Sequence, residues 1–588
     1  MKFTLLFFAA ITLLDAPIQA QSPTKPVPKV VLIGDSICGG YQKQVARRME
    51  RRVVLSNASA GGDSVSILKH LDEIIAGQPD VIHFNCGLYD LKQDKQTHAH
   101  QVELSDYTAN LKQIVARLQK ETHAALVFAN TTPIIDDRHA KQEDPFDFSE
   151  TDVRLYNAAA LSVMIEAAVP VHDLHRTVEE VGAESLIGPD GLHYTEVGYD
   201  RLAEAVADSV WRQWIVRHYE KWTPSHPSGA EAAKKYRETE AKLDAQVPAA
   251  YRNLPVGILS LPGSAKAWKQ QRPGVLKAVT DSLGDLPPRP SPSRARVISR
   301  ELRKGYTLER VSITNSASSD ISALMLIPDK RQPHAPAILW LHSSTPDKNH
   351  LISPDISTNT EALADAFMRA GYVVLAPDAC LYGERAEDMP SGISEASRRD
   401  EPESFKIAQD RLLKLNLWLG RTLWGMFVRD DQVALDYLCS RPEVDATRIG
   451  ATGMSMGSTR AWWLAAVDER VAATVGVACL TRYQNLLAHG SLRAHGLYYF
   501  GYGLLKHFDT EGVLSLIAPR PFLALTGDLD YGSPADGIKV LEDKVGRVYA
   551  TNGADERFKS ILYPDVGHAY TPEMRAEMLK WFERWLKP

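Results

Sequence analysis

Short apolar runs alternate with helix-like segments along most of this chain. In the first third the runs are rich in β-branched residues, and they lie at Val30–Ile33, Val53–Leu55, Val81–Phe84 and Ala125–Phe128. The alternation resumes after residue 305, with runs at Tyr306–Ile313, Ile321–Ile327, Ala337–Leu341, Tyr372–Ala376, Ile449–Thr452, Ala473–Val477, Phe522–Thr526 and Lys559–Leu562. Strands that alternate with helices are typical of α/β folds with a parallel sheet. We therefore predict an α/β protein.

A polar stretch with few strand signals separates the two alternating regions. It is first helix-like, as in Glu231–Lys235, and then proline-rich, as in Pro287–Pro292. At 588 residues the chain is also too long for one hydrophobic core. We predict a first α/β domain at residues 29–215, a helical, proline-rich linker region at 216–299, and a second α/β domain at 300–588.

The first twenty residues have the pattern of a signal peptide. Lys2 precedes an apolar run that extends from Phe3 to Leu14, and Ala20 provides a small residue for cleavage. A membrane-spanning helix would need roughly 20 apolar residues, and Asp15 and Pro17 interrupt this run. We therefore expect residues 1–20 to be removed, leaving a periplasmic or secreted protein without a membrane span.

Composition excludes some classes of partner. The chain is 44% hydrophobic and 24% charged, with a net charge of −6, and so lacks the basic surplus expected of a nucleic-acid-binding protein. The five cysteines have no CxxC spacing, which argues against a zinc site and against a disulfide framework. We expect no metal, no organic cofactor and no nucleic-acid partner.

A first set of residues for nucleophilic chemistry begins at the end of the first apolar run. Ile33 leads directly into Gly34-Asp35-Ser36, which places a serine hydroxyl in a turn after a buried strand. A serine needs a base to take its proton and a third group to hold that base. Asp190 and His193 supply such a pair near the end of the same domain.

Residues 29–215 resemble the SGNH, or GDSL, hydrolase family, and this resemblance implies a flavodoxin-like parallel sheet. It also implies Ser36 as the nucleophile, with Asp190 and His193 completing the triad, and Gly62 as a donor to the oxyanion. The family commonly has Gly-x-Asn-Asp after its third strand, whereas Gly87-Leu88-Tyr89-Asp90 stands here. Asn85, two residues before that glycine, is our candidate for the missing donor.

A second set lies in the last third of the chain. Ile449–Thr452 leads into Gly453-Met454-Ser455-Met456-Gly457, a GxSxG nucleophile elbow in which small residues permit a tight turn. An acidic loop follows a later strand and offers Asp528 and Asp530, of which we favour Asp530 because Asp528 comes directly after a glycine. His568 follows the last strand. Serine, acid and histidine in this order are typical of α/β-hydrolases.

Residues 300–588 resemble the α/β-hydrolase superfamily, in particular its acetyl xylan esterase, dienelactone hydrolase and prolyl-oligopeptidase-like branches. The resemblance implies Ser455, His568 and Asp530 as the triad. It also implies two backbone N–H donors to the oxyanion: that of Met456, and that of Ser343 in the loop after Ala337–Leu341.

Other conspicuous side chains of this half have less specific interpretations. His342 and His350 are interpreted as loop residues, because neither follows the acid in the expected order. Trp462 and Trp463 fall on the helix after the elbow, where core packing is favoured over a sugar-stacking platform. The sequence does not fix the role of the remaining aromatic candidates for a lid or pocket wall, which are Trp424, Tyr483, Tyr498, Tyr499 and Tyr502.

Together the two resemblances favour an exported, bifunctional serine esterase. Its expected partner is an acylated polysaccharide or oligosaccharide of the plant cell wall, with deacetylation of xylan as the first choice. The alternative is a single active α/β-hydrolase, with feruloyl, glucuronoyl or peptidase-like specificity, joined to an SGNH half that has degenerated into a binding or structural module.

Overall fold

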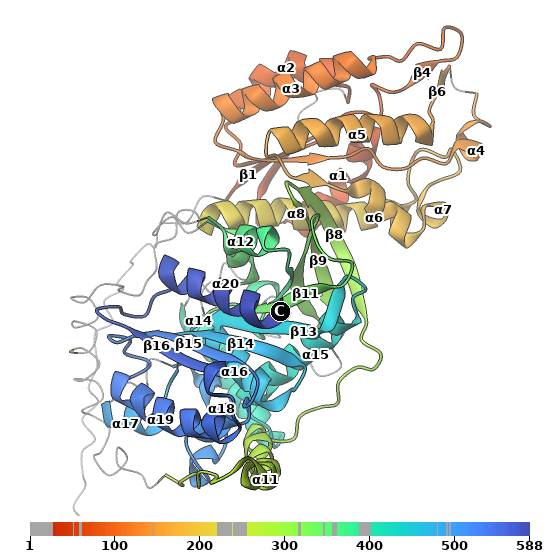
Figure 1. Ribbon diagram of the computed structural model, residues 1–588. Helices are drawn as coiled ribbons and strands as arrows, with labels where there is room; N and C mark the ends of the chain where they lie inside the picture. The colour runs from red at the N-terminus through yellow and green to blue at the C-terminus, as the bar shows by residue number, and fades with distance from the viewer. Residues whose placement is uncertain are drawn as a thin grey trace, which may run out of the picture.

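The computed structural model describes residues 27–219, 238 and 256–587, apart from short gaps (Figure 1). The gaps are at residues 51, 58–61, 144, 316–318, 345–346, 355–360, 387–401, 479, 490–491 and 493–494. The predicted signal peptide and Cys479 lie outside the described residues, whereas Cys38, Cys86, Cys380 and Cys439 are free thiols. No helix among the described residues is long and apolar enough to cross a membrane.

In the part of the first half that the structure describes, five parallel strands lie between helices. In sheet order the strands are β2 (Val54–Asn57), β1 (Lys29–Ile33), β3 (Val81–Phe84), β5 (Ala125–Ala129) and β7 (Val171–His172). The helices are α1 (Ser36–Arg48), α2 (Ser64–Ala76), α3 (Leu104–Glu121), α4 (Asp136–His139), α5 (Glu150–Glu166), α6 (Leu174–Val181), α7 (Ala183–Leu186) and α8 (Glu196–Tyr219), and a small hairpin pairs β4 (Gln93–Asp94) with β6 (Phe146–Asp147). The apolar strands and the buried helix faces form one core.

The described residues of the second half form nine strands, of which six are parallel to one another. The strands are β8 (Ala295–Arg303), β9 (Tyr306–Ile313), β10 (Ile321–Pro328), β11 (Ala335–Leu341), β12 (Val373–Pro377), β13 (Val444–Met454), β14 (Val471–Val477), β15 (Phe522–Gly527) and β16 (Phe558–Tyr563). The helices are α11 (Ala265–Leu283), α12 (Leu363–Arg369), α14 (Pro402–Trp418), α15 (Leu423–Ser440), α16 (Met456–Val467), α17 (Tyr483–His489), α18 (Thr510–Ser515), α19 (Ala535–Thr551) and α20 (Pro572–Leu586), with short 3₁₀ turns at η1 (Lys348–Ile352), η2 (Gly383–Ala386), η4 (Leu497–Tyr499), η5 (Leu504–Lys506) and η6 (Asp555–Arg557). Two hydrophobic clusters form its core.

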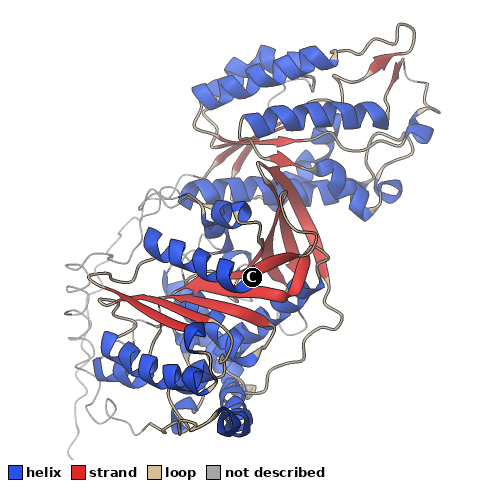
Figure 2. Ribbon diagram, in the orientation of Figure 1, coloured by secondary structure: helices blue, strands red, loops and turns tan. Residues whose placement is uncertain are grey.

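The two halves share one sheet. Strand β7 of the first half pairs antiparallel with β8, with Val171 opposite Leu302 and His172 opposite Glu301. The resulting fourteen-stranded sheet has the order β16-β15-β14-β13-β11-β12-β10-β9-β8-β7-β5-β3-β1-β2, and Figure 2 shows its strands running from one lobe into the other. The predicted two-domain α/β class is confirmed. The sequence did not predict that the two sheets join.

Part of the predicted linker region packs into the second half. Helix α11 buries Trp268, Val275 and Val279 in the same cluster as the strands of the second half. Strand β8 also begins inside the range 216–299, at Ala295. The second core therefore draws on residues well before position 300.

Ion pairs that contain buried arginines hold the seam between the halves. Arg212 of α8 bonds Glu301 of β8 at 2.6 Å, and their side chains are only 3% and 0% exposed. Arg300 pairs with Glu180 of α6 at 2.9 Å. Burial alone would raise the pKa of Glu301, but the charges of Arg212 and Arg303 lower it to about 2. Removing one partner of such a pair leaves an uncompensated buried charge and is strongly destabilising.

Two buried histidines beside this seam predict acid sensitivity. His83 Nε2 lies 3.1 Å from His172 Nδ1, both rings are fully buried, and burial lowers the pKa of His83 to about 4. The unfolded chain binds this proton near pH 6.5, so between pH 6.5 and 4 it binds more protons than the folded chain. We expect the free energy of unfolding to fall as pH falls through this window, by about 3 kcal/mol from His83 alone.

Urea unfolding at several pH values measures this slope. His83→Asn is expected to flatten it, whereas His123→Asn, at an exposed position, leaves it as in the parent. An equal slope in the parent and in His83→Asn contradicts the prediction.

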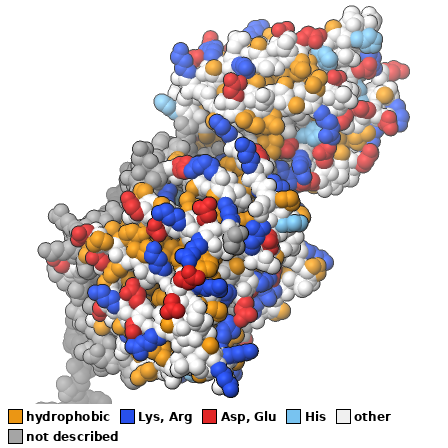
Figure 3. Space-filling view, viewed as in Figure 1, with side chains coloured by type: hydrophobic (Ala, Val, Ile, Leu, Met, Phe, Trp, Pro, Cys, Tyr) orange, Lys and Arg blue, Asp and Glu red, His pale blue; other side chains and the backbone are white. Residues whose placement is uncertain are grey.

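The surface of both lobes is mixed in charge. On the face drawn in Figure 3, basic and acidic side chains are interspersed over both lobes, which meet at a narrower waist. This mixture agrees with the small net charge of −6.

Candidate active sites

Ser36 stands where the first strand of the chain gives way to its first helix. Strand β1 ends at Ile33, and Asp35 caps α1 by accepting from the backbone N–H groups of Ile37 and Cys38. Aspartate is a favoured cap because its carboxylate satisfies N–H groups that have no partner within the helix. The cap fixes the turn that carries the serine hydroxyl.

The three residues predicted for the first site lie together. His193 Nε2 is 3.0 Å from Ser36 Oγ, and His193 Nδ1 is 2.7 Å from Asp190 Oδ2. Asp190 also accepts from the backbone N–H groups of Leu192 and His193. These bonds outweigh the effect of burial and lower the pKa of Asp190. The side chains of His193 and Asp190 are 45% and 38% exposed, so this site is open to solvent.

The predicted oxyanion donors of the first site border the same turn. Gly62 has φ +80°, and a Cβ there would come within 3.0 Å of Asp35 Cα and 2.7 Å of the Tyr89 ring. Asn85 is buried, and its Nδ2 donates to Asp35 Oδ2 at 2.9 Å. The amide of Asn85 therefore holds the residue next to the nucleophile, a contact that the sequence did not predict. One N–H of this amide group remains besides the one given to Asp35.

Ser455 occupies a strained elbow between β13 and α16. Its φ and ψ are 58° and −120°, a region that side-chain-bearing residues rarely adopt. Small residues are needed on both sides of the elbow. A Cβ at Gly453 or Gly457 would lie 2.2 or 1.9 Å from the carbonyl oxygen of Leu341. The elbow thus packs directly against the end of β11.

The residues predicted for the second site also meet. His568 Nε2 is 2.9 Å from Ser455 Oγ, and His568 Nδ1 is 2.8 Å from Asp530 Oδ2. The side chains of His568 and Asp530 are only 9% and 0% exposed, so this site is much less open to solvent than the first. Burial alone would lower the pKa of His568, but the charge of Asp530 raises it.

Asp528 makes no hydrogen bond to Ser455 or His568 among the described contacts. Its backbone N–H donates to Tyr563 O at 2.9 Å, which joins the loop to the end of β16. The structure therefore brings Asp530 rather than Asp528 to the histidine, as the sequence favoured.

The loop after β11 lies beside the elbow. A Cβ at Gly457 would lie 2.9 Å from the carbonyl oxygen of His342, so Ser343, the next residue, comes close to the nucleophile. Met456 begins α16, where backbone N–H groups have no partner within the helix. These are the two positions predicted to donate to an oxyanion.

Comparison with known proteins agrees with both sites. Residues 32–201 match the model of the GDSL-like lipase/acylhydrolase family, and residues 263–540 match that of an abhydrolase family. "Putative hydrolase YtaP" of Bacillus subtilis (strain 168) is 33% identical over 308 residues, which are 52% of this chain and 96% of that protein. The chain joins a GDSL-like domain to an abhydrolase domain. Both matched families are hydrolase families, and together with the two serine triads they make the chain a carboxylic-ester hydrolase.

Solved structures with similar folds cover little more than half of the chain. A glucuronoyl esterase from Solibacter usitatus has a TM-score of 0.43 and 18% identity, and covers 59% of this chain and 100% of its own. Acetyl xylan esterase 1 from Thermoanaerobacterium sp. has a TM-score of 0.36 and 16% identity, and covers 58% of this chain and 99% of its own.

His342, predicted only as a loop residue, holds the loop beside the abhydrolase elbow. Its ring is fully buried, and its Nε2 accepts from the backbone N–H of Ala379 at 2.9 Å. Its Nδ1 must then carry the proton, which it donates to the carbonyl oxygen of Ser343 at 2.6 Å. A lone histidine in a loop gave no sequence signal for this role.

A further histidine supports the acid of the abhydrolase triad. His495 Nε2 donates to the carbonyl oxygen of Gly532 at 2.9 Å, and the Gly532 N–H donates to Asp530 Oδ1 at 2.9 Å. Burial lowers the pKa of His495 to about 4, so the ring is neutral near pH 7. The sequence did not single it out, because it belongs to no motif.

The tryptophan pair on α16 is structural. Trp462 and Trp463 are 0% exposed and stack with ring centroids 5.9 Å apart inside the abhydrolase core. The prediction that they pack in the core rather than against a sugar is confirmed.

One group among the described residues has metal-ligating side chains at close spacing. It consists of Glu150, His175 and Glu179 in the GDSL-like half. The guanidinium of Arg154 already pairs with both carboxylates, at 2.9 and 2.6 Å. One of the two negative charges of this cluster is therefore already balanced by its own arginine.

The two serines follow strands that are far apart in the shared sheet. Counted along the sheet order, β1 and β13 are separated by nine steps. In Figure 1 β1 lies in the upper lobe and β13 in the lower one. The two sites therefore lie in different lobes.

Proposed function

We propose that this chain is an exported esterase with two active sites that removes acetyl or related acyl groups from a plant cell-wall polysaccharide such as xylan. The observation that carries the proposal is the pair of complete Ser–His–Asp sets, each with both hydrogen bonds formed. A lone motif is common by chance, but a complete and correctly hydrogen-bonded set on a matching hydrolase fold is not, and this chain has two such sets.

Each site would work by the same sequence of steps. The serine Oγ attacks the ester carbonyl while its proton passes to His Nε2, and the oxyanion is held by the donors beside the elbow or turn. The C–O bond to the alcohol breaks as the histidine returns the proton to the leaving oxygen. Water then attacks the acyl-enzyme with the histidine as base, releasing the acid and the free serine. The aspartate keeps the histidine in the required tautomer.

The family resemblance and the presence of two different sites support this substrate class. A polysaccharide that is decorated at several positions presents more than one kind of ester, and two sites that differ in exposure suit such a substrate. The open GDSL-like triad fits esters on a polymer surface, whereas the buried abhydrolase triad fits a group that enters a pocket. Export is proposed from the signal-peptide pattern of residues 1–20, and fractionation of expressing cells tests it.

One alternative has a specific observation in its favour. Tyr89 stands where the GDSL-like family has its asparagine, and the amide of Asn85 is already bound to Asp35. If no adequate oxyanion donor remains, only the abhydrolase half is an enzyme and the first half is a structural module.

Serine replacements in the full chain separate the two functions. Ser36→Ala and Ser455→Ala are each expected to remove only part of the activity on p-nitrophenyl acetate and acetylated xylan, because the other site remains. The double variant should retain none above background. Loss of all turnover in Ser455→Ala alone would establish the single-enzyme alternative, and an active double variant would refute the proposal.

A further inference from the structure

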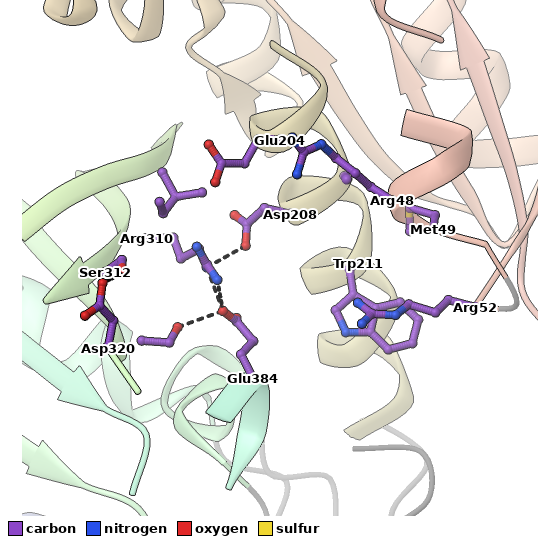
Figure 4. Close-up of a pocket in the computed structure, with 13 residues that line it drawn as sticks. Arg48, Met49, Arg52, Glu204, Asp208, Trp211, Arg310, Ser312, Asp320 and Glu384 are labelled. Carbon is purple, nitrogen blue, oxygen red and sulfur yellow. Dashed lines mark hydrogen bonds and ion pairs between the residues drawn. The ribbon is translucent and has the colours of Figure 1, made fainter. Parts of the chain in front are cut away.

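Helix α8 of the GDSL-like half lies against the abhydrolase half close to the loop beside its elbow. It packs on η1, the 3₁₀ turn that follows this loop. A cavity of about 320 Å³ lies between α8 and the second half, with Asp208 and Trp211 of α8 on one wall and Arg310 and Glu384 on the other (Figure 4). Among its charged side chains, Asp208 and Arg310 pair across the seam.

A series of contacts leads from α8 to the loop beside the elbow, and the first of them crosses the seam between the halves. Asp208 Oδ1 lies 2.8 Å from Arg310 Nε on β9, and Arg310 Nε donates to Glu384 Oε2 of η2 at 2.7 Å. Figure 4 shows Arg310 between the two carboxylates. The side chains of Asp208 and Arg310 are only 10% and 17% exposed, so their charges are weakly screened by solvent.

The second link is a fully buried lysine. Lys348 of η1 has a side chain that is 0% exposed, and its Nζ contacts Glu384 Oε1 at 2.9 Å and Asp378 Oδ2 at 2.5 Å. Burial alone would lower the pKa of Lys348, but the charges of Asp378 and Glu384 raise it. A buried ammonium is tolerated only while both partners stay in place.

These contacts end at the loop between His342 and Lys348, which carries Ser343. At one end, His342 Nε2 accepts from the N–H of Ala379. At the other end, the backbone N–H of Lys348 donates to Asp378 Oδ1 at 3.1 Å. His342 and Lys348, which flank Ser343 in the chain, are thus bound to the adjacent residues Asp378 and Ala379, after β12. His342 in turn donates to the carbonyl oxygen of Ser343, so the link to Ser343 runs through described residues, whereas residues 345–346 lie outside them.

We propose that α8 of the GDSL-like half positions the oxyanion loop of the abhydrolase site through Asp208, Arg310, Glu384 and Lys348. Asp208 is a positioning residue: it holds Arg310, which holds Glu384, and Glu384 holds the lysine that fixes one end of the loop. The first half then helps to position the second active site, although none of its atoms lies in that site. This inference rests on the proposed function only in assigning Ser343 to the oxyanion.

The test uses the full chain with Ser36→Ala, so that only the abhydrolase site turns over. In this background Asp208→Asn is expected to lower kcat about 10-fold with little change in KM, because a displaced donor affects the transition state more than ester binding. Asp208→Glu, which keeps the charge, should recover most of the rate. Asp200→Asn is the matched control, since Asp200 also lies on α8 but pairs with Arg48 of its own half.

Two further measurements keep the test sharp. In the Ser455→Ala background, Asp208→Asn should leave the first site unchanged, and an equal loss at both sites would overturn the proposal as an effect on folding. Glu384→Gln is expected to lower kcat at least as much as Asp208→Asn, and the double variant no more than Glu384→Gln alone. Additive losses, or an Asp208→Asn rate within 2-fold of its parent, overturn the proposal. An inactive Ser36→Ala parent refutes the proposed function instead.

Discussion

Asp530→Asn is expected to lower kcat of the abhydrolase site by about 10⁴-fold, the loss found for the corresponding change in the best-studied serine triad. Asp530 is fully buried and binds His568 Nδ1 at 2.8 Å. An asparagine in its place no longer stabilises the imidazolium that forms when Ser455 gives up its proton. It also permits the wrong tautomer of the histidine. The rate is measured in the full chain with Ser36→Ala, which silences the first site.

The pH profile of the same variant gives an independent readout. His568 must be neutral to act as a base, and the charge of Asp530 raises its pKa. In the Ser36→Ala parent, kcat should therefore fall as pH drops through this raised pKa. Without the carboxylate the pKa of His568 falls, so the inflection in the residual rate should move to lower pH.

Asp528→Asn is the matched control, two residues away in the same loop. Its backbone joins the end of β16, and its side chain does not contact His568. We expect a near-normal kcat and a decrease of about 1 kcal/mol in the free energy of unfolding. A larger catalytic loss in Asp528→Asn than in Asp530→Asn would reverse the assignment of the triad acid.

Asn85→Ala is expected to lower kcat of the GDSL-like site by about 10²-fold with little change in KM. Its amide holds Asp35 at 2.9 Å, and Asp35 caps the helix that begins with the nucleophile. The remaining N–H of the amide is the candidate donor to the oxyanion. Either contribution acts on the transition state rather than on ester binding. The measurement uses the full chain with Ser455→Ala.

Tyr89→Phe distinguishes the two candidates for the missing family asparagine. The Tyr89 ring lies against Gly62, and the phenylalanine keeps this contact while removing the hydroxyl. We expect it to be nearly silent. An unchanged kcat in Asn85→Ala together with a large loss of kcat in Tyr89→Phe would show that the tyrosine hydroxyl is the donor.

Both triads were predictable from the sequence because each depends on local chemistry and on chain order. Ser36 and Ser455 follow apolar strands that end in small residues, and such turns expose a hydroxyl whatever surrounds them. In the second half the acid and the histidine also follow strands, and the carboxyl ends of parallel strands meet at one edge of a sheet. This rule brings together Ser455 and His568, which are 113 positions apart.

Strand β8 shows what the sequence could not reveal. It reads as polar, because Ser299, Arg300 and Glu301 stand in its middle, yet all three are buried. Charges are tolerated inside only when opposite charges meet them, and Arg212 and Glu180 arrive from helices of the other half. No window of sequence around β8 contains those partners.

The sequence by itself determined that the chain has two α/β halves and which serine, histidine and aspartate of each half lie together, since periodicity, turn chemistry and strand order are local or follow from the topology of one domain. Only the tertiary structure decided that the halves share one sheet, that Asn85 binds Asp35, and that His342 and Lys348 fix the loop carrying Ser343. These features depend on buried polar groups whose partners are distant in the chain. Whether such a group raises or lowers the free energy of unfolding depends on the partners that the final packing brings to it, and no local pattern of residues encodes that packing.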